Sequence, residues 1–163
     1  MSGFKSLFHV SLHVADAKRS IAFYESIGLK HMFSLTEGGE DDEPWVAYMR
    51  VAHGQYIEIQ SVNAKTPADI PKQPDRSVNY SFNQTVWHFA LETENLEETI
   101  NDLVSKGIEV WTGPDKTKRV YSIDDAIRGG DGCKIAWICD PDGTPIELME
   151  QEGETLQRKY DRS

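Results

Sequence analysis

Cysteine and long apolar runs are scarce in this sequence. Its 163 residues include two cysteines, Cys133 and Cys139, which share one predicted strand and stand too far apart to bridge. We expect both to be reduced thiols, as in a cytosolic protein. No apolar segment follows Met1 as in a secretion signal, and no run approaches the length of a membrane span. We therefore predict a soluble, cytoplasmic protein with no membrane partner.

Positive charge is also in short supply. The 17 Lys and Arg residues are outnumbered by 27 Asp and Glu residues, which gives a net charge of −10. Cations gather only at residues 116–119. Nucleic acids and anionic membranes need clustered cations, so we predict that neither is a partner. A hydrophobic content of 39% allows one domain, or two small modules that share a sheet.

One pattern occurs twice along the chain. Each copy opens with a histidine in a short alternating run and closes with a glutamate between apolar residues, with a helical pattern between them. The copies contain His9, residues 17–27 and Glu58, and then His88, residues 96–105 and Glu147. Histidine and glutamate lie 58 − 9 = 49 positions apart in the first copy and 147 − 88 = 59 in the second. The chain is therefore predicted to repeat one structural unit.

Local signals predict the order β-α-β-β-β in both copies. Asp16 and Gly28 suit the start and the stop of the first helix, and Asn95 with Glu98 resembles a capping box at the start of the second. The predicted strands cover residues 7–14, 30–36, 45–51 and 55–61, then 85–93, 108–111, 133–139 and 144–150. A tight turn is predicted at residues 53–54 and another at residues 140–143.

These elements predict a single α+β domain over residues 1–163, with four parts. Module one covers residues 6–62, a connecting loop covers 63–84, and module two covers 85–150. The polar tail at residues 151–163 is expected to fray. Residues 63–84 and 112–131 are expected to be long loops, and a long loop in a compact domain is either functional or a linker.

The repeated histidines and glutamates point to a metal. Glu58 lies between Ile57 and Ile59, so its side chain points to the opposite face of the strand from theirs. A carboxylate on a covered face needs a partner, and a divalent cation supplies one. Any one of these residues alone fits an exposed polar position. Four in matching places favour a site built from His9, Glu58, His88 and Glu147.

Two motifs resemble a known superfamily. Residues 8–16, Phe-His-Val-Ser-Leu-His-Val-Ala-Asp, lead into Ser-Ile-Ala-Phe-Tyr-Glu at 20–25, and Asp-Pro-Asp-Gly at 140–143 leads into Ile-Glu-Leu at 146–148. Both are similar to the vicinal-oxygen-chelate superfamily, across about residues 6–150. That superfamily includes glyoxalase I, extradiol dioxygenases, methylmalonyl-CoA epimerase and fosfomycin-resistance enzymes. The resemblance implies two tandem βαβββ modules that form a cupped, eight-stranded mixed sheet.

Within the superfamily, the ligand set best matches glyoxalase I, which uses His, Glu, His and Glu. The resemblance places these ligands at His9, Glu58, His88 and Glu147. It implies one divalent metal per site (Ni, Co, Zn, Mn or Fe), catalytic roles for Glu147 as base and for Glu58, and a homodimer. Dioxygenases and fosfomycin enzymes use two histidines and one carboxylate, and the epimerase has glutamine at the place of Glu58.

The leading hypothesis is a lyase or isomerase that acts on a small α-oxygenated carbonyl substrate. The metal binds two substrate oxygens and stabilises an ene-diolate, while a glutamate moves the proton. Alternatives are a non-catalytic binding or resistance protein, an epimerase and an extradiol-type dioxygenase. A complete ligand quartet counts against the binding protein, and a fourth protein ligand leaves a dioxygenase fewer open positions for oxygen.

Two positions depart from bacterial glyoxalase I and bear on the substrate. His13 stands where those enzymes typically carry an arginine that holds glutathione, and Val62 stands where they carry an asparagine. His13 shares a strand face with His9, which makes it a candidate substrate contact. Further candidates for binding an anionic substrate are Arg119, Tyr121 and Arg128. We expect a substrate other than the glutathione hemithioacetal of methylglyoxal.

Overall fold

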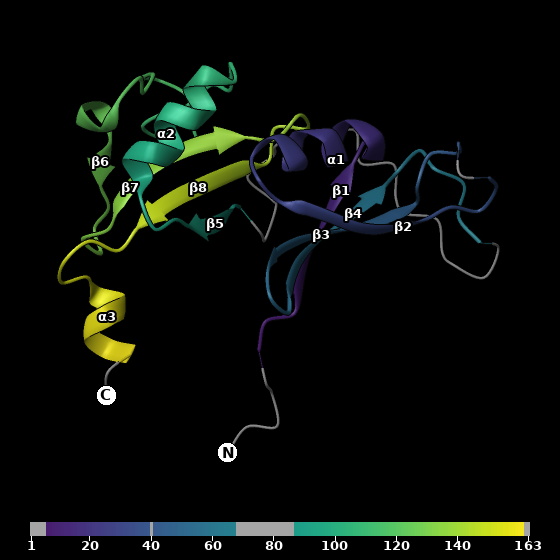
Figure 1. The fold of residues 1–163 in the computed structure, drawn as a ribbon, viewed down its shortest axis with the longest axis horizontal. Coiled ribbons are helices and arrows are strands. Elements are labelled where there is room, and N and C mark those ends of the chain that lie inside the picture. Colours follow the sequence, from purple (N-terminus) through teal and green to yellow (C-terminus); the bar gives the residue numbers. More distant parts are fainter. Residues whose placement is uncertain (1–5, 40, 68–86, 162–163) are drawn as a thin grey trace. The chain divides into compact units, whose positions relative to one another are not determined.

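The computed structural model describes residues 6–39, 41–67 and 87–161. The chain divides into two compact units, residues 1–80 and 81–163, and Figure 1 labels their helices and strands. Residues 68–84 of the predicted loop 63–84 and residues 85–86 of the predicted strand 85–93 lie outside the described residues.

Unit 1 is a four-stranded sheet with one helix. Its elements are β1 (His9–Val14), α1 (Ala17–Ser26), β2 (Lys30–Leu35), β3 (Val46–Ala52) and β4 (Gln55–Ser61). The strand order is β1-β4-β3-β2. β1 and β4 are parallel, whereas β3 is antiparallel to both β4 and β2. The predicted β-α-β-β-β order is therefore confirmed for the first copy.

The signals that predicted unit 1 also account for its packing. The Asp16 side chain caps α1 by accepting from the Arg19 amide at 2.8 Å, and Gly54, with φ of 76°, allows the turn between β3 and β4. One face of the sheet is apolar and packs against α1. Its buried residues include Val14, Met49, Ile57 and Ile59, with Tyr24 from the helix. The opposite face carries the polar residues of β1 and β4.

Unit 2 repeats this topology. Its elements are β5 (Phe89–Glu92), α2 (Leu96–Ser105), the 3-10 turn η1 (Ile123–Asp125), β6 (Ile127–Arg128), β7 (Lys134–Cys139), β8 (Pro145–Glu150) and α3 (Leu156–Asp161). The order β5-β8-β7-β6 places two parallel strands next to each other, as in unit 1. Asn95 caps α2 through the Glu98 amide at 3.0 Å. The predicted α+β fold with tandem βαβββ modules is confirmed.

The second module differs from the prediction in its outer strand. Residues 108–111 do not form a strand; only Trp111 forms bridges, to Arg119 and to Trp137. The outer strand is instead the two-residue β6, which pairs with β7 inside the segment 112–131 that was expected to be a loop. The prediction was wrong here because so short a strand depends on its neighbour and shows no alternation of its own.

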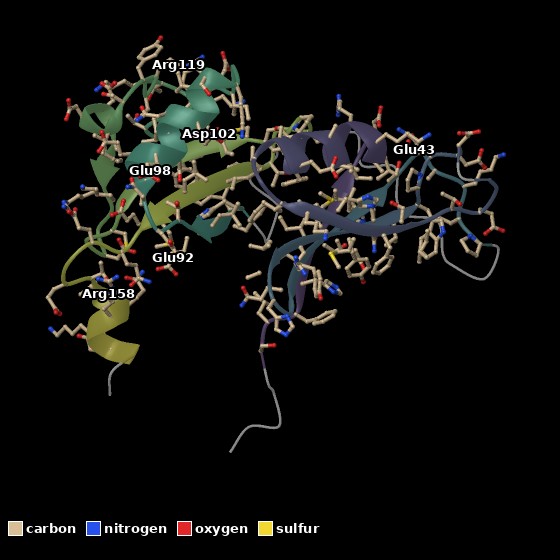
Figure 2. The ribbon with its side chains drawn as sticks, viewed as in Figure 1. Glu43, Glu92, Glu98, Asp102, Arg119 and Arg158 are labelled. Carbon is tan, nitrogen blue, oxygen red and sulfur yellow. The ribbon has the colours of Figure 1, made fainter. Side chains whose placement is uncertain are left out.

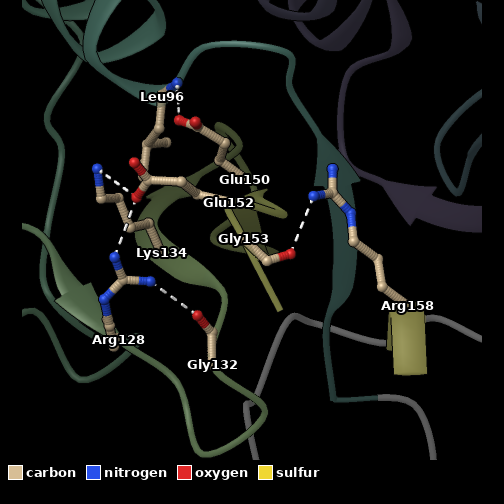
Figure 3. A network of polar contacts seen from close by, with 8 residues as sticks. All are labelled: Leu96, Arg128, Gly132, Lys134, Glu150, Glu152, Gly153 and Arg158. Atoms are coloured by element: carbon tan, nitrogen blue, oxygen red, sulfur yellow. Dashed lines mark hydrogen bonds and ion pairs between the residues drawn. The ribbon is translucent and has the colours of Figure 1, made fainter. Parts of the chain in front are cut away.

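The C-terminal tail is also more ordered than predicted. Residues 156–161 form α3, and Thr155 in front of it is buried, at 2% exposure. Gln157 donates to the Asp131 carboxylate at 2.6 Å, and the Leu156 amide donates to the Asp131 carbonyl at 2.9 Å. Glu152 pairs with Arg128 at 3.0 Å and with Lys134 at 2.8 Å (Figure 3). The expectation of a frayed tail was wrong because tertiary contacts hold this short polar helix.

The two cysteines are free, as predicted. Cys133 is buried just before β7, and Cys139 ends that strand. Burial, together with the neighbouring Asp131, raises the pKa of Cys133 to about 11, so its thiol is inert at neutral pH. Among the helices that the structure describes, none combines the length and apolar character needed to cross a bilayer.

Candidate functional site

In unit 1, strand register places the predicted ligands on the face away from α1. Ser11 of β1 pairs with Glu58 of β4, and His9 and His13 pair with Tyr56 and Gln60 on either side. Because alternate residues of a strand point to one face, these side chains share a surface. Leu12 and Val14, which alternate with these residues along β1 and face the helix, are buried.

Glu58 is buried on this face and is held by three donors. Ser11 Oγ donates to Oε1 at 2.9 Å, Gln60 Nε2 donates to Oε1 at 2.8 Å, and the Tyr48 hydroxyl donates to Oε2. Burial raises the pKa of Glu58, but the bonds from Tyr48, Ser11 and Gln60, with His9 nearby, outweigh it and lower that pKa below its ordinary value. The carboxylate is therefore ionised at neutral pH.

Tyr48 connects Glu58 to His9. Its hydrogen bond to Glu58, with burial and the charge of Glu58, raises the pKa of Tyr48 to about 12, so the hydroxyl remains a donor. The His9 ring lies edge-on to the Tyr48 ring, with centroids 5.8 Å apart. Within the described residues, His9 Nδ1 is buried and has no hydrogen-bond partner. Burying a nitrogen without a hydrogen-bond partner costs free energy of folding. His9 is therefore a candidate to bind another group through Nδ1.

Unit 2 brings its own histidine and glutamate into contact. His88 comes directly before β5, and Glu147 on β8 pairs with Ala90 of β5. The distance from His88 Nε2 to Glu147 Oε2 is 3.3 Å, with side-chain exposures of 27% and 19%. The His88 ring lies edge-on to Trp137 at 4.9 Å between centroids. His88 Nδ1 is buried and lacks a hydrogen-bond partner in the described part of the chain.

These pairs fit a divalent metal in their chemistry. Two atoms that bind one cation at about 2.0–2.2 Å lie about 3.0–3.5 Å apart at octahedral or tetrahedral angles, and the 3.3 Å between His88 and Glu147 falls in that range. Imidazole and carboxylate are ligands of Zn, Ni, Co, Mn and Fe. Across the described ranges, no group of three or more His, Cys, Asp or Glu side chains is placed to hold a metal ion. The expected ligands stand as one pair in each unit.

The other predicted site residues are mostly engaged elsewhere. His13 is exposed on the face that carries His9. Arg119, labelled in Figure 2, forms an ion pair with Glu109 and stacks on Trp111 at 4.7 Å. Tyr121, 64% exposed, lies 5.7 Å from the Arg119 guanidinium. Arg128 donates to the Gly132 carbonyl at 2.9 Å and pairs with Glu152 (Figure 3).

Sequence reasoning missed two of the residues around Glu58. It placed Ser11 on the face of His9, but it did not single out Tyr48 or Gln60. A signal for Gln60 was present, because it lies two positions after Glu58 on the same strand face. Tyr48 faces Glu58 only through the register of the β3–β4 hairpin. Counting outward from the turn at residues 53–54 misses that register by one residue, which places Met49 opposite Glu58 instead.

Two known enzymes are similar to this chain over most of its length. Lactoylglutathione lyase of Salmonella typhimurium is 28% identical over 147 residues, which cover 88% of this chain and 91% of that protein. The enzyme of the same name from Escherichia coli O157:H7 is 28% identical over 149 residues, 90% and 93% of the two chains.

Two solved structures share the fold. A glyoxalase family protein from Enterococcus faecalis has a TM-score of 0.58 at 23% identity and covers 90% of this chain and 98% of its own. Lactoylglutathione lyase from Agrobacterium tumefaciens has a TM-score of 0.59 at 14% identity, covering 91% and 96%. The family model of the Glyoxalase/Bleomycin resistance protein/Dioxygenase superfamily matches residues 6–148. The chain therefore belongs to this superfamily.

Proposed function

We propose that the protein is a divalent-metal-dependent lyase or isomerase of the glyoxalase I type, acting on a small α-oxygenated carbonyl compound. The observation that carries this proposal is the contact of 3.3 Å between His88 and Glu147, together with His9 and Glu58 at the matching positions of the other module. Relatives named lactoylglutathione lyase, at 28% identity over most of the chain, support it.

In this proposal His9, Glu58, His88 and Glu147 hold one cation per site. Their nitrogen and oxygen atoms suit nickel, cobalt, manganese or iron, and zinc as well. When bound, the metal supplies Lewis-acid activation of the substrate carbonyl. Among the described residues, His9 Nδ1 is buried without a hydrogen-bond partner, and His88 presents Nε2 to Glu147, so each ring has a nitrogen that could bind the cation.

The proton transfer is assigned to Glu147. Its carboxylate takes a proton from the carbon next to the substrate carbonyl and returns it to the former carbonyl carbon, while the hydroxyl proton passes from one substrate oxygen to the other, so the step balances without an external oxidant or reductant. Glu147 contacts His88 and is partly exposed, which leaves an oxygen accessible to substrate. Glu58 is bound by three donors and is the less mobile of the two carboxylates.

We further propose that the substrate lacks a glutathione group. Glutathione carboxylates require fixed cations, usually an arginine. His13 occupies the arginine position here, and Val62 occupies the asparagine position. Asn63, the residue after Val62, donates its side-chain amide to the Ala15 carbonyl at 2.9 Å. Arg119 and Arg128 are paired with Glu109 and Glu152. A small polar substrate such as a sugar or keto-acid derivative needs fewer fixed cations in the site than glutathione does.

Metal analysis of the purified full chain tests the proposal. We expect one divalent ion per chain, loss of activity with a chelator, and recovery with one of the metals named above. His88→Ala removes a ligand and lowers occupancy, whereas His53→Ala, at an exposed turn between β3 and β4, is the matched control. Equal metal content in these two variants contradicts the proposal. A screen of sugar-like and 2-oxo compounds, with and without glutathione, then identifies the substrate class.

A further inference from the structure

The two modules treat their glutamates differently. Glu58 accepts hydrogen bonds from one residue on each of three adjacent strands: Ser11 of β1, Tyr48 of β3 and Gln60 of β4. We call Ser11, Tyr48 and Gln60 the donor cage. Two of its bonds reach Oε1 and one reaches Oε2, so both oxygens are fixed. A carboxylate has about four lone-pair positions, which leaves room for one further ligand.

The second module lacks this cage at the same positions. Register places Ala90 and Trp137 beside Glu147, as it places Ser11 and Tyr48 beside Glu58. Met149 follows Glu147 by two residues, as Gln60 follows Glu58. Ala and Met side chains have no strong donor, and no hydrogen bond from Ala90, Trp137 or Met149 to Glu147 occurs in the described part of unit 2.

Tyr48 is itself held in place. Its ring stacks on Phe33, with centroids 4.9 Å apart and planes at 21°. It also meets the Tyr56 ring edge-on, at 6.0 Å. These contacts restrict the ring independently of its hydroxyl, so Tyr48→Phe preserves the packing and removes only the hydrogen bond to Glu58.

We propose that Ser11, Tyr48 and Gln60 are positioning residues that hold the Glu58 carboxylate in the orientation in which it binds the metal. The proposal rests on the metal-dependent function proposed above. Residues that orient a metal ligand through hydrogen bonds typically change metal affinity or activity by about 10–100-fold when removed. The donor cage restricts the Glu58 carboxylate, and the matching positions of the second module place no such restriction on Glu147.

Metal binding to the full chain tests the cage directly. Tyr48→Phe, Ser11→Ala and Gln60→Met are compared by competition between protein and a chromophoric chelator for Co²⁺, and by the visible spectrum of the Co²⁺ form. The last two changes install the residue types of the second module. We expect about 10–100-fold weaker binding and an altered Co²⁺ spectrum.

Two controls separate positioning from general destabilisation. Ser11→Thr retains a hydroxyl and is expected to restore affinity and spectrum, which a folding defect does not allow. Tyr56→Phe makes the same chemical change on the same face, at a residue with no hydrogen bond to Glu58, and is expected to bind Co²⁺ as the wild type does. Thermal unfolding of each metal-free variant identifies any that is misfolded.

The outcomes distinguish this inference from the function on which it rests. If the wild type binds no Co²⁺, or binds it equally well after His9→Ala, the proposed function and the cage both fail. If the wild type binds through His9 but folded cage variants retain its affinity and spectrum, the cage alone fails. The reverse graft, Ala90→Ser with Met149→Gln, is expected to tighten binding by fixing Glu147, and unchanged affinity counts against the cage.

Discussion

At the scale of single residues, the two glutamates are the sharpest contrast in the molecule. Glu147→Gln retains the shape and one oxygen but removes the basicity. We expect turnover of the identified substrate to fall by about 10²–10⁴, the usual contribution of general acid–base catalysis, while metal still binds. Steady-state kinetics and metal analysis of the same preparation measure both effects. Near-normal turnover would indicate that Glu58 or His13, and not Glu147, is the base.

The alternation of side chains along a strand made some of these residues predictable from the sequence, but not all of them. The period of two in a strand places His9 with Ser11 and His13 on one face, and the paired apolar neighbours of Glu58 and Glu147 place each glutamate opposite them. The structure agrees in both units. Tyr48 was not predictable in the same way, because its contact with Glu58 crosses a hairpin whose pairing shifts between Arg50 and Ala52.

At the scale of elements, α3 has one contact that changes with pH, the hydrogen bond from Gln157 to the Asp131 carboxylate. The hydrogen bond from Gln157, against the opposing effect of burial and with help from the Cys133 amide, lowers the pKa of Asp131 below its ordinary value of 3.8. A group with a lowered folded pKa stabilises the fold above its unfolded pKa and loses this effect as pH falls through the folded value. We therefore expect the protection of α3 amides to decrease below about pH 3.8.

Amide hydrogen exchange, expressed as protection factors, measures this change. The Leu156 amide, which donates to the Asp131 carbonyl at 2.9 Å, is the natural reporter, and the Ile100 amide in α2 is the internal control. Asp131→Asn removes the titrating group, so its α3 protection is expected to be lower at neutral pH and to lose the acid-dependent step. A step that persists in Asp131→Asn would assign the effect to another carboxylate.

Elements with their own local signals were predicted, and elements that depend on neighbours were not. The helices α1 and α2 have capping residues and apolar spacing, and both formed where expected. β6 has two residues and α3 has six, too few for a periodic pattern. Their contacts with β7 and Asp131 come from positions that only the folded chain brings together.

At the scale of the whole molecule, net charge bears on the substrate. A charge of −10 opposes an anionic tripeptide, and the cations Arg119 and Arg128 are already paired. We expect the fully metallated protein to turn over the glutathione hemithioacetal of methylglyoxal poorly. A steady-state assay gives the answer. A kcat/KM of roughly 10⁴ M⁻¹s⁻¹ or above, the ordinary enzymatic range, would make the protein a plain glyoxalase I.

The last prediction concerns assembly. Each unit supplies one histidine and one glutamate, so a four-ligand site needs both modules, either of one chain or of two chains in a homodimer. We propose the homodimer, with His9 and Glu58 of one subunit joined by the His88 and Glu147 positions of its partner. Sedimentation or light scattering of the full chain is expected to give twice the monomer mass of 18.5 kDa.

Mixing two inactive variants decides which modules meet. In a cross-chain dimer of His9→Ala and His88→Ala subunits, one site carries both lesions and the other carries neither, so activity and metal return to about half of the sites in each mixed dimer. If both modules come from one chain, every site retains a single lesion and nothing returns. The two variants are mixed under conditions where differently tagged subunits demonstrably exchange, and mixed wild-type subunits serve as the control. Proven exchange without recovery would assign each site to a single chain.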